Sequence, residues 1–297
     1  MLIDDQGRRL ESFDEMATEV TEFFSGLLGN ADPGVKNCDH NLLKDLMQFN
    51  LPPYYSSNLV KAVTDEEIKE ANFNQGNEKA LGPDGFTPYF FKKLWSVVEE
   101  DVIKAIKYFF QETFILPAFN ATTIVLVPKV PNPNKVREFR PIFCCSVIYK
   151  TITKILVKRL TTLLPGIISR NQLAFVKGRN IVDNTLLAQE LGARGIRQCD
   201  HISPILFVLA MNVLSIILNL AAARGLFRYL PKCKKIGLTH ISFIDDLLIF
   251  CKGNIESITR IISALDQFYE LSGLKLNAAK CELYTAGISF RNLEHIL

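Results

Sequence analysis

The 297-residue sequence lacks the features that mark several common classes of protein. It has no internal repeat and no low-complexity tract, which excludes a solenoid and a disordered scaffold. Its seven cysteines contain no C-x-x-C pair and do not cluster with the four histidines at the spacing of zinc ligands. Scattered cysteines are typical of reduced thiols, so we expect an intracellular protein, nuclear or cytoplasmic. Charged residues among the first ten positions exclude a secretory signal.

One apolar run, residues 205–223, is long enough to cross a membrane. Within it, Asn212, Ser215 and Asn219 follow the spacing i, i+3 and i+7, which places them on one face of a helix. Such a polar stripe fits a helix buried in a protein core better than one that faces lipid. We therefore expect no membrane association, with a membrane-embedded or purely structural protein as an alternative.

Charge is distributed unevenly along the chain. Residues 1–78 contain 6 Lys or Arg and 15 Asp or Glu, a net charge of −9, whereas residues 79–297 contain 28 and 16, a net charge of +12. Two capping-box patterns, Ser12–Glu15 and Thr64–Glu67, predict helices in the acidic part. We therefore expect an acidic helical arm over residues 1–78. The basic remainder favours a polyanionic partner such as nucleic acid, although charge alone is not specific.

Helix and strand patterns are mixed in the basic part. Residues 122–127 predict a β-branched strand, and residues 147–164 predict a helix with isoleucines on one face and a row of lysines on the other. Residues 239–251 then predict a short strand, Asp245-Asp246 and a second short strand, followed by an amphipathic helix that ends at Gly273. The order of helix, hairpin and helix within one domain indicates the α+β class.

The dipeptide Asp245-Asp246 is the strongest candidate for chemistry. Two carboxylates ~4 Å apart repel each other by about 1 kcal/mol in water and about 4 kcal/mol at an effective dielectric constant near 20. Neither glycine nor asparagine supplies the usual chemistry of a hairpin turn here. A divalent cation would make the interaction attractive, and carboxylate oxygens are ligands that Mg²⁺ prefers. For the dipeptide alone, an exposed polar turn is the alternative.

Together with its neighbours, the dipeptide resembles a known family. Phe243-Ile-Asp-Asp246 is similar to the F-x-D-D hairpin of reverse transcriptases, particularly those of LINE-type (non-LTR) retrotransposons. Other segments resemble that family in the same order over residues 63–287. They are Lys79–Phe86, Val127–Lys129, Phe139–Ile142, Tyr149-Lys150, Gln172–Arg179, Gly195–Gln198, Ser203-Pro204 and Gly273–Asn277. The resemblance implies a right-hand polymerase fold, with fingers over residues 79–191 and an incomplete palm over residues 192–297.

The resemblance also implies an activity and a set of site residues. The activity is RNA-directed DNA polymerisation, in which Mg²⁺-dependent nucleotidyl transfer adds deoxynucleoside triphosphates to a DNA primer along an RNA template. Asp245 and Asp246 would bind the metal ions and catalyse the transfer. The implied nucleotide-binding residues are Lys129, Arg140, Gln198 and Lys280. The implied contacts to the nucleic-acid backbone are Lys150, Lys154, Lys158 and Arg179, although the lysine row alone is equally typical of a solvated helix face.

One departure of the chain from the family concerns the carboxylates of the metal site. Two-metal transfer needs a further carboxylate on a neighbouring strand, which the family places in a D-L-x-K-A-F-D segment between its Q-E-L helix and its G-I-R-Q loop. Here Gln189-Glu-Leu191 is followed after three residues by Gly195, so that segment is missing. The acids nearby do not lie in an apolar strand pattern: Asp183, Glu190 and Asp200. We therefore expect a defective polymerase; the alternative is a non-catalytic nucleic-acid-binding remnant of a retrotransposon polymerase.

Overall fold

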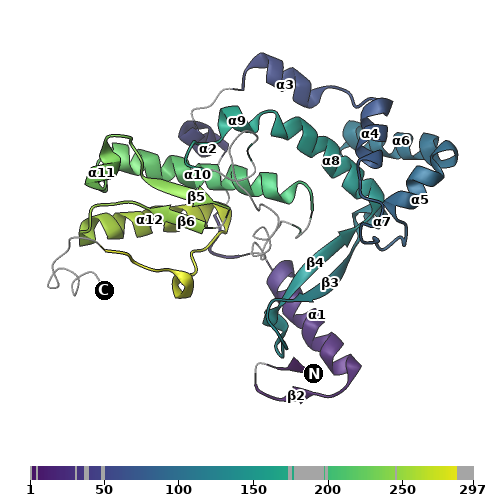
Figure 1. Ribbon diagram of the computed structural model, residues 1–297, viewed down its shortest axis with the longest axis horizontal. Helices are drawn as coiled ribbons and strands as arrows, with labels where there is room; N and C mark the ends of the chain where they lie inside the picture. Colours follow the sequence, from purple (N-terminus) through teal and green to yellow (C-terminus); the bar gives the residue numbers. More distant parts are fainter. Residues whose placement is uncertain are drawn as a thin grey trace. The chain divides into compact units, whose positions relative to one another are not determined.

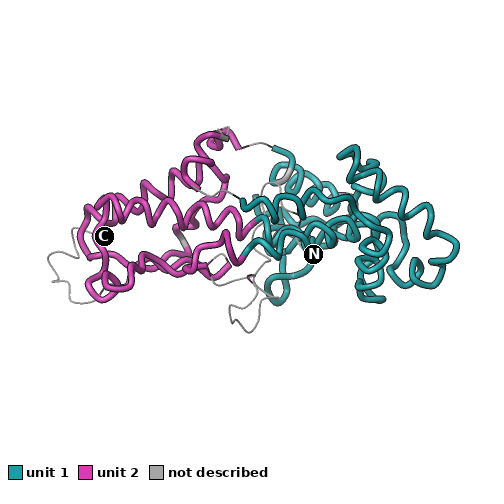
Figure 2. The backbone as a smooth tube through the Cα atoms, turned by 90° about the horizontal axis from the view of Figure 1, so that it is seen from above, with its two compact units in different colours: residues 1–30, 51–164, 185–206 teal, residues 31–50, 165–184, 207–297 magenta. Residues whose placement is uncertain are grey.

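The computed structural model describes residues 2–4, 6–30, 32–36, 40–47, 51–172, 176, 197, 200–244 and 246–285. The chain divides into two compact units (Figure 2). Unit 1 contains residues 1–30, 51–164 and 185–206, and unit 2 contains residues 31–50, 165–184 and 207–297. Helices are combined with three two-stranded antiparallel sheets among the described residues, in agreement with the predicted α+β class. The domain boundaries at residues 78/79 and 191/192 stay predictions.

Unit 1 is built around a helical core (Figure 1). Its helices are α3 (Pro53–Val60), α4 (Asp65–Phe73), α5 (Pro88–Lys93), α6 (Trp95–Glu112), α7 (Pro117–Asn120) and α8 (Val147–Thr161). As the spacing predicts, α8 buries its isoleucines, with Ile148, Ile152 and Ile155 at most 4% exposed. They pack against Ile68 of α4 and Ile106 of α6, so α4, α6 and α8 share one apolar core.

The N-terminal residues cover a two-stranded sheet of unit 1. They form β1 (Leu2–Ile3), β2 (Arg9–Leu10) and α1 (Phe13–Gly29), and the sheet consists of β3 (Thr122–Pro128) and β4 (Phe139–Cys145), joined through the short helix η1 (Val136–Glu138). Leu10 and Phe24 pack against Val136, Leu126 and Phe139. A two-stranded sheet is marginally stable by itself in water, so this apolar cover stabilises it.

The two predicted capping boxes differ in outcome. At α1 the box is complete, because Ser12 Oγ accepts the Glu15 amide at 3.1 Å and the Glu15 carboxylate accepts the Ser12 amide at 3.2 Å. At α4 it is half formed: Thr64 Oγ1 accepts the Glu67 amide at 3.2 Å, but the Glu67 carboxylate binds both ends of the Arg159 guanidinium at 2.8 and 3.0 Å. A bidentate, charge-assisted pair outcompetes the single bond to the backbone.

Unit 2 places a hairpin beside two long helices (Figure 1). Its elements are α2 (His40–Met47), α9 (Leu164–Ile167), α10 (Ser203–Ala223), α11 (Pro231–Lys234), β5 (His240–Phe243), β6 (Asp246–Ile249), α12 (Ile255–Ser272) and η2 (Ala278–Lys280); α9 and α10 begin with the last residues of unit 1. Ala221 and Ala222 of α10, Ile261 of α12 and Ile249 of β6 meet around the buried Phe227. The hairpin therefore lies on a shared apolar core.

The polar stripe of α10 is hydrogen-bonded inside the protein. Asn212 accepts the Ser169 amide at 2.8 Å and donates to the Ile167 carbonyl at 3.1 Å. Ser215 Oγ lies 2.9 Å from His240 Nε2, and Asn219 accepts a hydrogen bond from Thr239. Among the described helices α10 is the one long and apolar enough to span a membrane, and 61% of its apolar window is buried in the protein. These contacts support the prediction of a core helix.

The buried His240 predicts a pH-dependent stability. Its side chain is fully buried, and this burial lowers its pKa from 6.5 to about 4. Between pH 6.5 and 4 the unfolded chain therefore binds a proton that the folded chain does not, so the free energy of unfolding falls as the pH falls. The full loss is about 3 kcal/mol. Urea unfolding at pH 7 and pH 5 will show a steeper loss in the wild type than in His240→Gln, and equal losses would contradict the prediction.

Candidate active site

The hairpin formed by β5 and β6 carries the candidate catalytic dipeptide. Phe243 pairs with Asp246 at the end of the ladder, and Ile244 lies in the turn between the two strands. The predicted hairpin is present, but its turn lies one residue earlier than the sequence pattern suggests, because Asp246 is already the first residue of β6. Asp246 is exposed, whereas Asp245 lies outside the described residues.

The turn holds Ile244 in a strained conformation. Its φ of 55° lies in the left-handed region, where a β-branched residue is rare because the side chain collides with the backbone. Two-residue hairpin turns require positive φ, which glycine or asparagine normally supplies. The Ile244 side chain is 0% exposed. Its burial therefore offsets a backbone strain of about 1–2 kcal/mol and holds the tip of the hairpin in one conformation.

The donor at the tip fits a magnesium ion. An exposed carboxylate supplies the hard oxygen that Mg²⁺ prefers, and Mg²⁺ commonly takes one or two protein carboxylates together with water and substrate phosphates. Asp246 is such a donor. Within the described parts of the chain, no group of three acidic, cysteine or histidine side chains is arranged to hold a metal ion.

Asp200 has a structural partner in unit 1. Asp200 is 6% exposed; its Oδ2 accepts a hydrogen bond from the Tyr149 hydroxyl at 3.1 Å, and its Oδ1 is buried without a partner. Burial and this carboxylate together raise the pKa of Tyr149. The Arg197 guanidinium stacks on the Tyr149 ring at 4.6 Å and donates to Asn120. Asp200 thus anchors its loop to α8. The other acids considered as replacements, Asp183 and Glu190, lie outside the described residues.

Two candidate nucleotide-binding residues lie at one end of the β3–β4 sheet. Arg140 pairs with Val127 in the ladder, and the Lys129 amide donates to the Glu138 carbonyl at 2.7 Å just beyond it. Lys129 is exposed, and the Nε atom of Arg140 is buried without a hydrogen-bond partner. Lys280 is exposed on η2 of unit 2. Gln198 and Arg179 fall outside the described residues, and the roles of all five stay predictions.

The lysine row of α8 has intramolecular partners. Lys150 donates to the Ala80 carbonyl at 2.7 Å, Lys154 to the Asn74 carbonyl at 2.5 Å, and Lys158 to the Glu70 carboxylate at 2.5 Å. The row therefore holds α4 and the loop after it against α8, a role that the sequence pattern did not predict. Each ammonium group has three donors, so the predicted contacts to a nucleic-acid backbone remain compatible with these bonds and stay a prediction.

Two further lysines, Lys79 and Lys92, lie near this row. Lys92 binds the same loop, donating to the Gln75 carbonyl at 2.5 Å and to Asn77 at 2.7 Å. Burial lowers the pKa of Lys154, and the nearby charges of Lys92 and Lys79 lower it further. We call Lys79, Lys92, Lys150 and Lys154 the lysine cluster. Lys79 begins the Lys79–Phe86 motif, but no spacing in the sequence relates Lys92 to α8.

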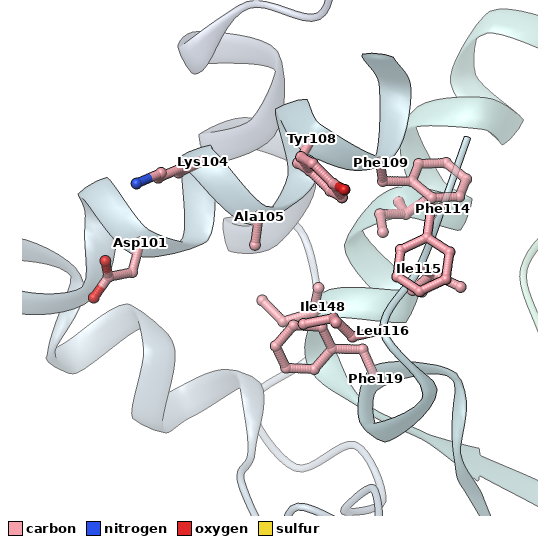
Figure 3. Close-up of a pocket in the computed structure, with 11 residues that line it drawn as sticks. Asp101, Lys104, Ala105, Tyr108, Phe109, Phe114, Ile115, Leu116, Phe119 and Ile148 are labelled. Atoms are coloured by element: carbon pink, nitrogen blue, oxygen red, sulfur yellow. The ribbon is translucent and has the colours of Figure 1, made fainter. Parts of the chain in front are cut away.

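An apolar cavity of about 340 Å³ also lies in unit 1 (Figure 3). Aromatic and aliphatic side chains surround it, among them Phe109 of α6, Phe114, Phe119 of α7 and Ile148 of α8. Asp101 and Lys104 of α6 are its charged lining residues. Such a lining suits an apolar group and offers little to a phosphate.

Comparison with known proteins finds a family match for part of the chain. Residues 189–295 match the family model described as reverse transcriptase (RNA-dependent DNA polymerase). A Transposon TX1 uncharacterized 149 kDa protein of Xenopus laevis is 27% identical over 129 residues, which are 43% of this chain and 10% of that protein. A Retrovirus-related Pol polyprotein from type-1 retrotransposable element R2 of Bradysia coprophila is 31% identical over 97 residues, which are 32% of this chain and 10% of that protein. The chain thus spans about a tenth of the length of these relatives.

The strain at Ile244 predicts an unusual order of stability between two variants. Both Ile244→Ala and Ile244→Gly lose a buried side chain, at a cost of about 2–5 kcal/mol. At negative φ, glycine is less stable than alanine by about 0.5–1 kcal/mol. At φ 55° only glycine relieves the strain, so we expect Ile244→Gly to be the more stable of the two by about 1 kcal/mol.

The same pair of substitutions at Ile241 of β5 provides the control, because Ile241 has no positive φ. Alanine should be the more stable variant there. Urea unfolding monitored by circular dichroism measures all four differences. If alanine is the more stable variant at both positions, the strain is absent.

Proposed function

We propose that this chain, which carries a reverse transcriptase domain of a LINE-type element, is an RNA-directed DNA polymerase domain in which nucleotidyl transfer is defective. The observation that carries the proposal is the hairpin of Phe243 and Asp246, which presents a carboxylate beside a strained turn within the residues that match the family. The right-hand arrangement of fingers and palm belongs to the same proposal.

In the proposed function, acidic residues bind the metal ion and basic residues bind the triphosphate. Asp245 and Asp246 would hold Mg²⁺, and the ion would activate the attacking hydroxyl and neutralise charge on the phosphates. Lys129 and Arg140, which share one end of the β3–β4 sheet, would bind the triphosphate through charge-assisted hydrogen bonds. The unpartnered Nε of Arg140 favours this role, because it leaves a buried donor available to a ligand oxygen.

The proposed defect follows from the missing carboxylate. The described residues of unit 2 place no third acid beside Asp246. The buried Asp200 is already bonded to Tyr149 in unit 1. Without a bridging carboxylate, the second metal ion would lose much of its coordination. It would then contribute little to stabilising the transition state. We expect the rate of transfer to be at least ~10³-fold below that of an intact site.

The lysine cluster supports a second candidate function, a non-catalytic remnant that binds RNA or DNA. The ammonium groups of Lys150 and Lys154 donate to the backbone carbonyls of Ala80 and Asn74. These carbonyl groups carry no net charge, so they do not neutralise the lysines. Burial lowers the pKa of Lys154, and the charges of Lys92 and Lys79 lower it further; the negative charge of a phosphate group would offset this repulsion. Binding of this kind requires neither Asp245 nor a complete palm.

Primer extension tests the first proposal. On an RNA template with a DNA primer, deoxynucleotides and Mg²⁺, we expect the wild type to incorporate no more than the double variant Asp245→Asn/Asp246→Asn. Asp266→Asn is the matched control, because Asp266 is an exposed acid of the same unit. Incorporation that survives in Asp266→Asn and disappears in the double variant would refute the defect and establish the activity.

Salt-dependent binding tests the second candidate. We expect affinity for single-stranded RNA to fall steeply from 50 to 200 mM salt, since each phosphate contact contributes a slope of about −0.7 in a double-logarithmic plot. Lys79→Gln/Lys154→Gln should reduce that slope by about 1–1.5. Lys104→Gln, an exposed lysine of the same unit, should leave it unchanged. A wild-type chain that retains no RNA at low salt would contradict this function.

A further inference from the structure

Residues 32–36 lie against the C-terminal end of α12, although more than 230 positions separate the two segments. The Lys36 amide donates to the Glu270 carbonyl at 2.8 Å, and the Lys36 ammonium lies 2.8 Å from the Glu270 carboxylate. The Tyr269 hydroxyl donates to Asp32 Oδ2 at 3.0 Å. Backbone and side chains therefore both contribute to this contact, which we call the clasp.

On the N-terminal side of the clasp, residues 32–35 form a tight turn. Asp32 accepts the Gly34 amide through its side chain at 2.9 Å and the Val35 amide through its carbonyl at 3.0 Å. A Cβ on Gly34 would lie 2.5 Å from the Tyr269 hydroxyl oxygen, so this position is in direct contact with the helix. A Cβ on Gly273 would likewise lie 3.2 Å from Val35. The two glycines allow the turn and the end of α12 to approach closely.

The clasp also supplies a positive charge, which the last turn of α12 lacks. That turn contains Glu270 and no basic residue, although the negative end of the helix dipole favours a cation. The Lys36 ammonium provides the missing positive charge from elsewhere in the chain. The side chains of this ion pair are 69% and 43% exposed, so the pair contributes little by itself. The backbone bond and the Tyr269 bond must therefore carry most of the contact.

Tyr269 connects the clasp to the segment that follows the helix. Its hydroxyl binds Asp32, while its ring lies 5.5 Å below the ammonium of Lys275. Gly273 ends α12 with a φ of 74°, and residues 273–280 then lead to η2 and Lys280. One side chain thus contacts both the N-terminal turn and the segment that carries Lys280.

We infer that residues 32–36 act as a positioning element, which clasps the end of α12 and thereby orders residues 273–280 for contact with a nucleic acid or nucleotide phosphate. The part of this inference that concerns phosphate rests on the proposed function. The residues of the clasp touch no ligand themselves and act through Tyr269.

Hydrogen exchange of the full chain tests the clasp. The variant Lys36→Ala/Tyr269→Phe removes the ion pair and the hydroxyl bond but keeps the ring under Lys275. We expect amides of residues 273–280 to exchange about tenfold faster, because two hydrogen-bonded links are lost. The control Lys252→Ala/Tyr229→Phe makes the same two changes elsewhere in unit 2 and should leave the exchange unchanged. Affinity for single-stranded RNA should fall about two- to fivefold in the clasp variant only.

Unchanged exchange in the clasp variant overturns the inference, and so does equally faster exchange in the control. Faster exchange with unchanged RNA affinity overturns the positioning role. If the wild type binds no RNA at any salt concentration, the proposed function fails separately. The hydrogen-exchange rates of residues 273–280 then test the clasp by themselves. Faster exchange in the clasp variant alone supports the ordering role of the clasp, and unchanged exchange refutes it.

Discussion

A buried polar group that lacks a partner costs more free energy than a hydrogen bond contributes, and this asymmetry organises unit 2. The face of α10 that carries Asn212, Ser215 and Asn219 is acceptable in the core only when residues 167–169 and the start of β5 supply its partners. Those partners fix where β5 begins. Because β5 is only four residues long, its start also determines where the hairpin turns.

The turn itself is held by packing. Ile244 is unsuited to positive φ, yet its fully buried side chain leaves no freedom to relax. Backbone strain of this kind is common where a functional group must be presented in one orientation. The hairpin therefore combines a hydrogen-bonded base with a strained tip, and Asp246 emerges from the tip into solvent.

Local patterns in the sequence predicted much of this arrangement. The capping box at Ser12, the polar stripe of α10 and the hairpin around Asp245-Asp246 depend on residues a few positions apart, and the structure contains all three. The partners of the lysine row and the use of Glu67 by Arg159 were not predictable, because they join positions 70–92 residues apart. The clasp joins still more distant residues. The candidate site was recognised through the F-x-D-D motif, but the strain at Ile244 depends on burial, which the motif does not encode.

The great sequence distance between Lys36 and Glu270 has a consequence for biosynthesis. Residues 1–30 and the β3–β4 sheet they cover are complete once Cys145 has left the ribosome. The clasp, by contrast, cannot close until Glu270 has also been made, and closing so long a loop costs additional entropy. Residues 1–30 and the β3–β4 sheet can therefore acquire their structure early in translation, whereas residues 32–36 remain unattached until α12 has emerged.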